Sequence, residues 1–212
     1  METPSEISRV AEEQTVSDGS AICFKNVSYR YHEGGDAAIS DISFSVMPGQ
    51  TVGIIGGTGS GKSTLVQLMP GFYAPSTGSV LINGKNTALY EKDELRNQFG
   101  VVSQKATLFK GTIRSNLQWG CSDAEDDAIW RALDLAQAKD FVEQKPNGLD
   151  EPVQQNGSNF SGGQKQRLSI ARALLKQPKF LILDDSASAL DYVTESRLRR
   201  AIATLEYDPT IL

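Results

Sequence analysis

The residues with the clearest chemistry lie in a glycine-rich segment, Gly56 to Ser63, which reads GGTGSGKS. It matches the pattern G-x-x-x-x-G-K-[ST] and stands between a short apolar run and a helical pattern, as a phosphate-binding loop requires. Glycines let successive backbone N–H groups turn toward phosphate oxygens, and the helix start adds a partial positive charge. Lys62 would supply a full charge to the β- and γ-phosphates, and the Ser63 hydroxyl would be a ligand for Mg²⁺.

The alternative is a glycine-rich turn that only begins a helix. The flanking pattern favours a nucleoside triphosphate site, whose predicted ligand residues are Gly56, Gly57, Thr58, Gly59, Ser60, Gly61, Lys62, Ser63 and Thr64.

Two adjacent carboxylates, Asp184 and Asp185, end the apolar run in FLILDDSASALD (residues 180–191). In a protein with a phosphate-binding loop, the acid at the tip of a neighbouring apolar strand holds Mg²⁺. Asp184 is therefore a predicted metal ligand. The alternative is a carboxylate that only marks the solvent end of a strand.

A second helix start, NFSGGQKQR at residues 159–167, contains another candidate anion site. Ser161 and Gln164 have the spacing of a capping box. Two glycines in the first helical turn cost helix stability, on the order of 1 kcal/mol each relative to alanine. An anion site would explain these glycines, because exposed backbone N–H groups at the start of a helix bind anions. Ser161, Gly162, Gly163 and Gln164 are the predicted ligands.

Apolar patterning indicates the elements that must position these residues. Alternation over about 22–31 and 42–46 predicts half-buried strands, with a one-residue break in the first. The run TVGIIGG (51–57) predicts a central parallel strand that leads into the glycine loop. Further strands are expected over SVLING (79–84) and FGVVSQ (99–104), and the chain turns helical from about residue 105.

The remaining pattern predicts helices that alternate with strands. SDAE at 122–125 has capping-box spacing ahead of an apolar face with Ile129 and Leu133. A helix is expected from Ser161 to just before Pro178, then a buried strand over KFLILDD, and a last helix around Leu198. The terminal PTIL resembles the start of another strand, which predicts a domain truncated at its C-terminus.

Composition limits the class of protein. The chain has 212 residues, 39% hydrophobic content and a formal net charge of −5, which argues against a nucleic-acid partner. Cys23 and Cys121 are too few for a disulfide framework, so a reducing compartment is expected. No apolar run approaches the about 18 residues needed to cross a bilayer. Residues 1–20 are polar and acidic and predict a linker or frayed arm.

Taken together, these motifs resemble those of the ABC transporter ATPase family over nearly the whole chain from about residue 22. GGTGSGKST resembles the Walker A loop, FLILDD Walker B, FSGGQ the signature motif and SALD (188–191) the D-loop. VVSQ resembles the Q-loop, which implies a catalytic and Mg²⁺-binding role for Gln104. VSYRY is similar to the strand with the adenine-stacking aromatic, a role placed on Tyr31 with Tyr29 as competitor. A tyrosine in an alternating strand can equally be core packing.

The resemblance implies an α/β fold, with a RecA-like P-loop NTPase core, an antiparallel β subdomain and an inserted helical subdomain. The cassette would span residues 21–212, with its core at 21–104 and 165–212 and the helical subdomain at about 105–164. ATP and Mg²⁺ are the implied cofactors. The implied partners are a second cassette and a transmembrane domain at the cytoplasmic face of the cell membrane. LFKGTIRSNL (108–117) is similar to the corresponding segment of exporters.

Three departures from the family pattern suggest an impaired site. The family has Glu where this chain has Asp185, and a misplacement of about 1 Å can cost on the order of a hundredfold in rate. The only histidine is His32, far upstream, so no switch histidine stands in this chain. Gln154 to Gly157 replaces the usual exporter pattern before the signature. We therefore expect Asp185 to be a poor catalytic base, and the chain to be the weaker half of a heterodimer.

A nucleotide-holding regulatory subunit with little turnover is the main alternative to an export ATPase. Proteins of DNA repair or translation would need a coiled-coil insertion or two tandem cassettes, which do not fit in 212 residues. A small-molecule kinase fits the glycine loop but not the FSGGQ motif.

Overall fold

The computed structural model describes residues 19–212, which divide into two compact units. One unit runs to Phe99 and includes Thr210–Leu212, and the other is Gly100–Pro209. The predicted arm at residues 1–20 lies, except for its last two residues, outside the described part. The predicted boundaries of the helical subdomain stay a prediction. No helix within residues 19–212 is long and apolar enough to cross a bilayer.

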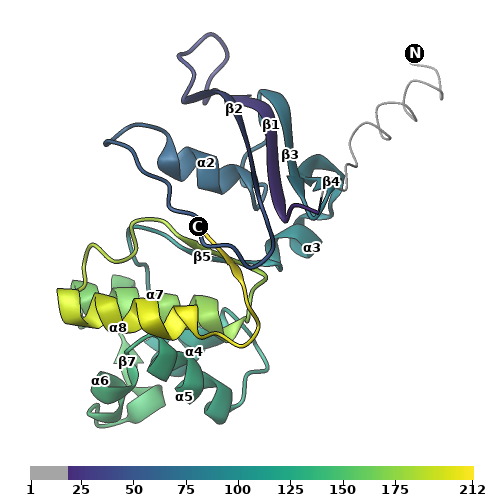
Figure 1. Ribbon diagram of the computed structural model, residues 1–212. Helices are drawn as coiled ribbons and strands as arrows, with labels where there is room; N and C mark the ends of the chain where they lie inside the picture. The colour runs from purple at the N-terminus through teal and green to yellow at the C-terminus, as the bar shows by residue number, and fades with distance from the viewer. Residues whose placement is uncertain (1–18) are drawn as a thin grey trace. The chain divides into compact units, whose positions relative to one another are not determined.

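The first unit is built on an antiparallel sheet with the strand order β2-β1-β3-β4 (Figure 1). Ile22 and Phe24, then Val27 and Tyr29, are buried along β1, and the expected break in alternation is a bulge at Asn26, where φ is 49°. Phe24 stacks on Phe44 with ring centroids 4.7 Å apart. The strands of this sheet are β1 (Ile22–Tyr29), β2 (Ile39–Val46), β3 (Thr77–Ile82) and β4 (Lys85–Asn86).

The other elements of this unit are short. They are α2 (Lys62–Leu68), η1 (Thr87–Leu89), α3 (Lys92–Arg96) and β9 (Thr210–Ile211). Leu68 and Met69 are fully buried, as the helical spacing after the glycine loop predicts.

The expected central strand over 51–57 is not a strand in this structure. Thr51 forms one parallel bridge with Ile211, and the Val52 N–H donates to the Ile211 carbonyl at 2.8 Å. Residues 52–57 then continue without regular pairing, and Ile55 is 98% exposed. The apolar run has the composition of a strand. In the first unit, however, it pairs only at Thr51, and only with the two-residue strand β9.

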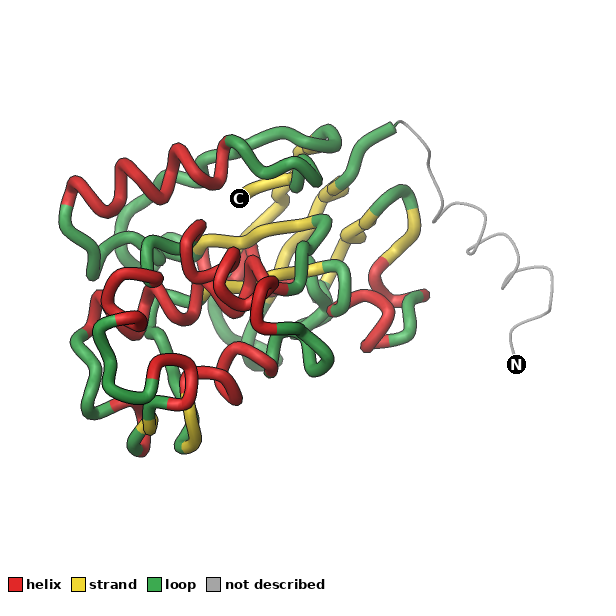
Figure 2. The backbone as a smooth tube through the Cα atoms, turned by 90° about the horizontal axis from the view of Figure 1, so that it is seen from below, coloured by secondary structure: helices red, strands yellow, loops and turns green. Residues whose placement is uncertain are grey.

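The second unit holds most of the helices that are drawn in red in Figure 2, namely α4 to α8. Strand β5, most of which lies in this unit, is next to β8, and α4 and α5 pack on α7. Its elements are β5 (Phe99–Val102), β6 (Gly111–Thr112), α4 (Ile113–Gln118), α5 (Asp126–Leu135), α6 (Lys139–Glu143), η2 (Gly148–Asp150), β7 (Pro152–Val153), η3 (Gln155–Gly157), α7 (Gly162–Leu175), β8 (Phe180–Leu183) and α8 (Tyr192–Ala203).

Helix α5 corrects one sequence prediction. Its buried face contains Ile129 and Leu133, as expected, but the capping box predicted at 122–125 is wrong. Ser122 bonds to Asp123 instead, and the helix begins at Asp126 with Glu125 as a cap that makes no side-chain hydrogen bond. The Ala124 N–H donates to the Cys121 carbonyl, so a turn occupies the residues that the pattern assigned to the helix start.

Candidate functional site

The glycine-rich loop enters α2 through a backbone that only glycine fits. Gly61 has φ of 87°, and an added Cβ would lie 2.6 Å from the carbonyl oxygen of Ala38. The Leu65 N–H donates to the Gly61 carbonyl at 2.8 Å, which starts the helical ladder. Residues 56–60 are exposed, so the main chain of the loop is open to a ligand.

The side chain of Lys62 folds back over this loop. Its Nζ donates to the carbonyl oxygens of Gly56 at 2.7 Å and Gly57 at 2.9 Å. An ammonium group has three N–H donors, so one proton remains for another acceptor. Ser63 is exposed in the first turn of the helix. The loop therefore presents a full positive charge and a hydroxyl side by side, which suits a polyanion and a hard cation.

Tyr31 lies beside the same helix. β1 ends at Tyr29, and two residues later the Tyr31 hydroxyl forms a hydrogen bond with Thr64 Oγ1 at 2.8 Å. Tyr31 is 51% exposed, whereas Tyr29 is only 8% exposed. Burial, and then the nearby phenols of Tyr73 and Tyr31, raise the pKa of Tyr29. The structure thus brings Tyr31 and Thr64 together and buries the competitor Tyr29.

In the second unit, Asp184 and the Q-loop begin where two adjacent strands end. The Asp184 N–H donates to the Val102 carbonyl at 2.9 Å, and Asp184 is half-buried. The next carbonyl, that of Ser103, accepts from Nε2 of the buried Gln166 at 3.3 Å. Gln104 follows directly, so the predicted metal ligands Gln104 and Asp184 share one end of this sheet.

Asp185 and Gln104 are in direct contact. Gln104 Nε2 donates to Asp185 Oδ2 at 2.7 Å. The Asp185 carbonyl accepts from Ser188 Oγ at 2.9 Å, and its backbone is left-handed with φ of 49°. A non-glycine residue adopts this conformation uncommonly, although aspartate is enriched there. The second of the paired carboxylates is therefore held by both its side chain and its backbone.

The signature segment forms the capping box that its spacing predicts. The Ser161 N–H donates to Gln164 Oε1 at 3.0 Å, and the Gln164 N–H donates to Ser161 Oγ at 3.2 Å. This prediction is confirmed. The capping leaves the N–H groups of Gly162 and Gly163 at the start of α7, where a helix has no internal acceptors for them.

The D-loop passes close to this helix start. An added Cβ at Gly163 would lie 3.0 Å from the Ala189 carbonyl oxygen, whereas at Gly162 it would meet no heavy atom within 4 Å among the described residues. Asp191 ends the D-loop and caps α8 through the Thr194 N–H at 3.0 Å. Hydrogen bonds from the backbone and then the hydroxyl of Thr194 lower the pKa of Asp191.

The predicted site residues thus form two groups. The first unit holds the glycine loop, Lys62 and Tyr31, and the second holds the Q-loop, the paired carboxylates and the signature segment. Sequence reasoning missed Tyr73, whose ring contacts both Tyr29 and Tyr31. The signal was a pair of aromatics, Phe72 and Tyr73, before the turn-forming residues APSTG.

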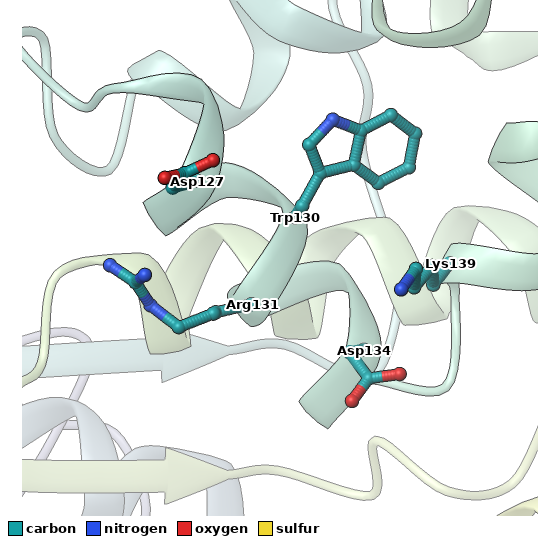
Figure 3. A pocket seen from close by; sticks show the side chains of 5 residues that line it. All are labelled: Asp127, Trp130, Arg131, Asp134 and Lys139. Atoms are coloured by element: carbon teal, nitrogen blue, oxygen red, sulfur yellow. The ribbon is translucent and has the colours of Figure 1, made fainter.

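A shallow depression on α5 and the start of α6 is separate from these residues (Figure 3). It carries charges of both signs around one indole and contains none of the predicted site residues. Its lining is Asp127, Trp130, Arg131, Asp134 and Lys139.

Comparison with known proteins places these observations in one family. The family model described as ABC transporter matches residues 39–188, more than half of the chain. The chain belongs to the ABC transporter family.

ABC transporter proteins from several bacteria are similar to most of the chain. It is 48% identical over 195 residues to the uncharacterized ABC transporter ATP-binding protein YfiB of Bacillus subtilis, covering 91% of this chain and 34% of that protein. It is 46% identical over 195 residues to an ATP-dependent lipid A-core flippase of Albidiferax ferrireducens, covering 90% and 33%. A solved structure of a bacterial Atm1-family ABC exporter with ATP bound matches with a TM-score of 0.87 and 35% identity, covering 92% and 34%.

These matches confirm the predicted α/β fold class of an ABC ATPase. The antiparallel sheet and the helical elements expected from the resemblance are both present. The chain spans about a third of the length of these relatives.

The residues present fit the nucleotide and Mg²⁺ that bind to ABC ATPases. The loop main chain is exposed, Lys62 lies over it, and a half-exposed tyrosine is bonded to the same helix. The hydroxyl of Ser63, the amide oxygen of Gln104 and the carboxylate of Asp184 are oxygen donors of the kind that Mg²⁺ prefers.

The contact between Gly163 and Ala189 predicts different results for two neighbouring alanine substitutions. Gly162→Ala should raise the free energy of unfolding by up to about 1 kcal/mol, because alanine favours a helix and the site is open. Gly163→Ala should give no gain or a loss, since its methyl group displaces the Ala189 carbonyl. Urea denaturation of both variants measures the difference, and amide chemical shifts of residues 187–191 should move only in Gly163→Ala. Equal stabilisation by both would show that the contact is not restrictive.

Proposed function

We propose that this chain is the ATP-binding cassette of an exporter. It binds MgATP at the 56–64 loop and hydrolyses it at an interface with a second cassette. The released free energy powers export by a transmembrane partner at the cytoplasmic face of the cell membrane. Relatives named a flippase and an exporter support this, and each is about three times as long as the chain.

One observation carries the nucleotide part of the proposal: Lys62 is the first residue of α2, and Tyr31 is hydrogen-bonded to the same helix. The Lys62 ammonium lies on the loop carbonyls, and the Tyr31 phenol is bonded to Thr64 two residues further along the helix. A cation and an exposed ring held on one short helix suit a ligand with phosphates at one end and an aromatic base at the other.

Hydrolysis needs a water molecule whose oxygen bonds to the γ-phosphorus while the bond from that phosphorus to the β–γ bridging oxygen breaks. In this proposal, the Asp185 carboxylate would accept the proton of that water. Gln104, bonded to Asp185 at 2.7 Å, would orient the water or the base. Ser63, Gln104 and Asp184 are the residues that would hold Mg²⁺, which would supply positive charge to the phosphate oxygens.

The signature segment serves a second copy of the cassette in this proposal. Gly162 and Gly163 present N–H groups at the start of α7, and the capping box leaves these donors open. Ser161, Gly162, Gly163 and Gln164 would hold the γ-phosphate of a nucleotide bound to the loop of the partner. A composite site of this kind makes dimerisation a condition of turnover.

The geometry of Asp185 favours a second candidate, in which this chain is the weakly hydrolysing half of a heterodimer. Its carboxylate is a methylene shorter than the family's glutamate and is already bonded to Gln104. Such a chain would still bind nucleotide and would lend its signature segment to the competent site of its partner.

An exposed aromatic pair supports a membrane-domain contact on the second unit. Phe109 and Trp119 stack with ring centroids 4.8 Å apart, and Trp119 is 70% exposed. The buried Asn116 holds the Phe109 backbone, because Oδ1 accepts its N–H and Nδ2 donates to its carbonyl, both at 2.8 Å. Arg172 Nε donates to the Asn116 carbonyl at 2.9 Å. A rigid, exposed aromatic surface of this kind suits a protein interface.

The nucleotide proposal is tested by Lys62→Ala. Loss of a charged hydrogen-bonding group should weaken ATP binding by about tenfold to a hundredfold, measured by titration calorimetry. Lys92→Ala, on the exposed face of α3, is the matched control and should bind as the unmodified chain does. Unchanged ATP affinity in folded Lys62→Ala would contradict the proposal.

The heterodimer proposal is tested by amide substitutions in the assembled transporter. Asp185→Asn should lower single-turnover hydrolysis by less than about threefold, whereas the same substitution of the partner's Walker B carboxylate should lower it by about a hundredfold or more. Equal losses from the two substitutions would mean that Asp185 is a competent base.

The membrane-domain contact is tested with the two tryptophans of the chain. Trp119→Ala in the full transporter should lower export by about tenfold or more, because truncation of a central interface aromatic costs that much. ATP binding should be unchanged. Trp130→Ala, in the depression on α5, is the control and should retain export. Normal export by Trp119→Ala would remove this surface from the proposal.

A further inference from the structure

Three tyrosine rings of the first unit contact one another. Tyr31 meets Tyr29 at a centroid distance of 5.0 Å and Tyr73 at 5.6 Å, with interplanar angles of 82° and 84°. Tyr29 and Tyr73 lie 5.3 Å apart and are tilted by 31°. Edge-to-face contact is a favoured arrangement of aromatic pairs, and two such contacts on one ring constrain its plane.

The three rings differ in their exposure. Tyr29 is buried, whereas Tyr31 is 51% and Tyr73 38% exposed. Tyr29 therefore anchors the cluster in the sheet, and the other two reach the surface. A half-exposed ring would ordinarily move between rotamers, but Tyr31 is also bonded through its hydroxyl to Thr64.

Tyr73 reaches this cluster from the far end of the phosphate helix. α2 begins at Lys62 and ends at Leu68, and the turn after it is closed by the Phe72 N–H, which donates to the Gln67 carbonyl at 3.1 Å. The same helix therefore carries the Lys62 ammonium at its first residue and is followed by the ring of Tyr73. Tyr31 lies against both Thr64, in the first turn, and Tyr73.

We infer that Tyr73 is a positioning residue for the nucleotide base, acting through Tyr31. This rests on the proposed nucleotide site. Tyr73 holds the ring of Tyr31 in one orientation before a base stacks on it. A ring ordered in advance loses less freedom on binding, which is the general basis of preorganisation. The ligand is a nucleotide whose aromatic base contributes to affinity, and the contribution depends on Tyr73.

The test compares two ligands that share phosphates and differ in the base, ATP and inorganic tripolyphosphate. Tyr73→Leu in the full chain should weaken ATP binding by about threefold to tenfold, the range expected for one side chain that must be ordered on binding. Tripolyphosphate affinity should stay within about twofold of the unmodified chain, because Lys62 and its loop are unaltered. Tyr73→Phe retains the ring and should restore ATP binding.

Two controls separate positioning from a general structural effect. Phe72→Leu removes the neighbouring exposed ring, which contacts Arg96 rather than Tyr31, and should change neither affinity. In a Tyr31→Leu background, Tyr73→Leu should cause no further loss of ATP affinity, since the ring that it positions is gone. Tyr73→Ser, suited to an exposed loop, replaces the leucine variant if that variant does not fold.

Equal loss of ATP and tripolyphosphate affinity would overturn the inference, as would an unchanged ATP affinity or an additive effect in the Tyr31→Leu background. In each of these results, a Lys62-dependent affinity for ATP would leave the proposed function standing. No ATP binding by the unmodified chain would overturn both.

Discussion

The candidate nucleotide site depends on one crowded point in the backbone, where Gly61 passes the Ala38 carbonyl with no room for a side chain. The left-handed turn at this residue sets the direction in which α2 leaves the loop. That direction determines where the Lys62 ammonium, the Thr64 hydroxyl and the turn with Tyr73 come to lie. A local steric constraint between two loops thus places groups that a ligand with two chemically different ends requires.

The second unit joins its motifs by short contacts rather than by a common helix. Gln104 bonds to Asp185, Ser188 bonds to the Asp185 carbonyl, and the next residue, Ala189, lies against Gly163 of the signature helix. Four motifs from three separate stretches of the sequence are therefore linked through a few residues. The start of the signature helix is therefore connected to the Asp185 main chain through two neighbouring residues of the D-loop.

Local chemistry explains which features could be predicted from the sequence. The capping box at Ser161 and the one-residue break in the alternation of β1 were predictable, because each is decided by neighbouring residues and periodicity. The strand expected over 51–57 and the cap at 122–125 were not, because pairing partners and competing turns lie outside the pattern. Tyr73 was missed for a related reason: its contacts with Tyr29 and Tyr31 cross more than forty residues of sequence. The periodicity of apolar residues along the chain gives no information about contacts between residues so far apart in the sequence.

The backbone at Asp185 bears on why the chain has aspartate there at all. Left-handed torsion angles are tolerated far better by aspartate and asparagine than by residues with longer stems. A glutamate placed on the same φ of 49° would carry its carboxylate one methylene further from the main chain, in a backbone region where aspartate is enriched. The length of the acidic side chain and the left-handed backbone therefore make opposite demands at this residue. The shorter acid is the one that suits the turn.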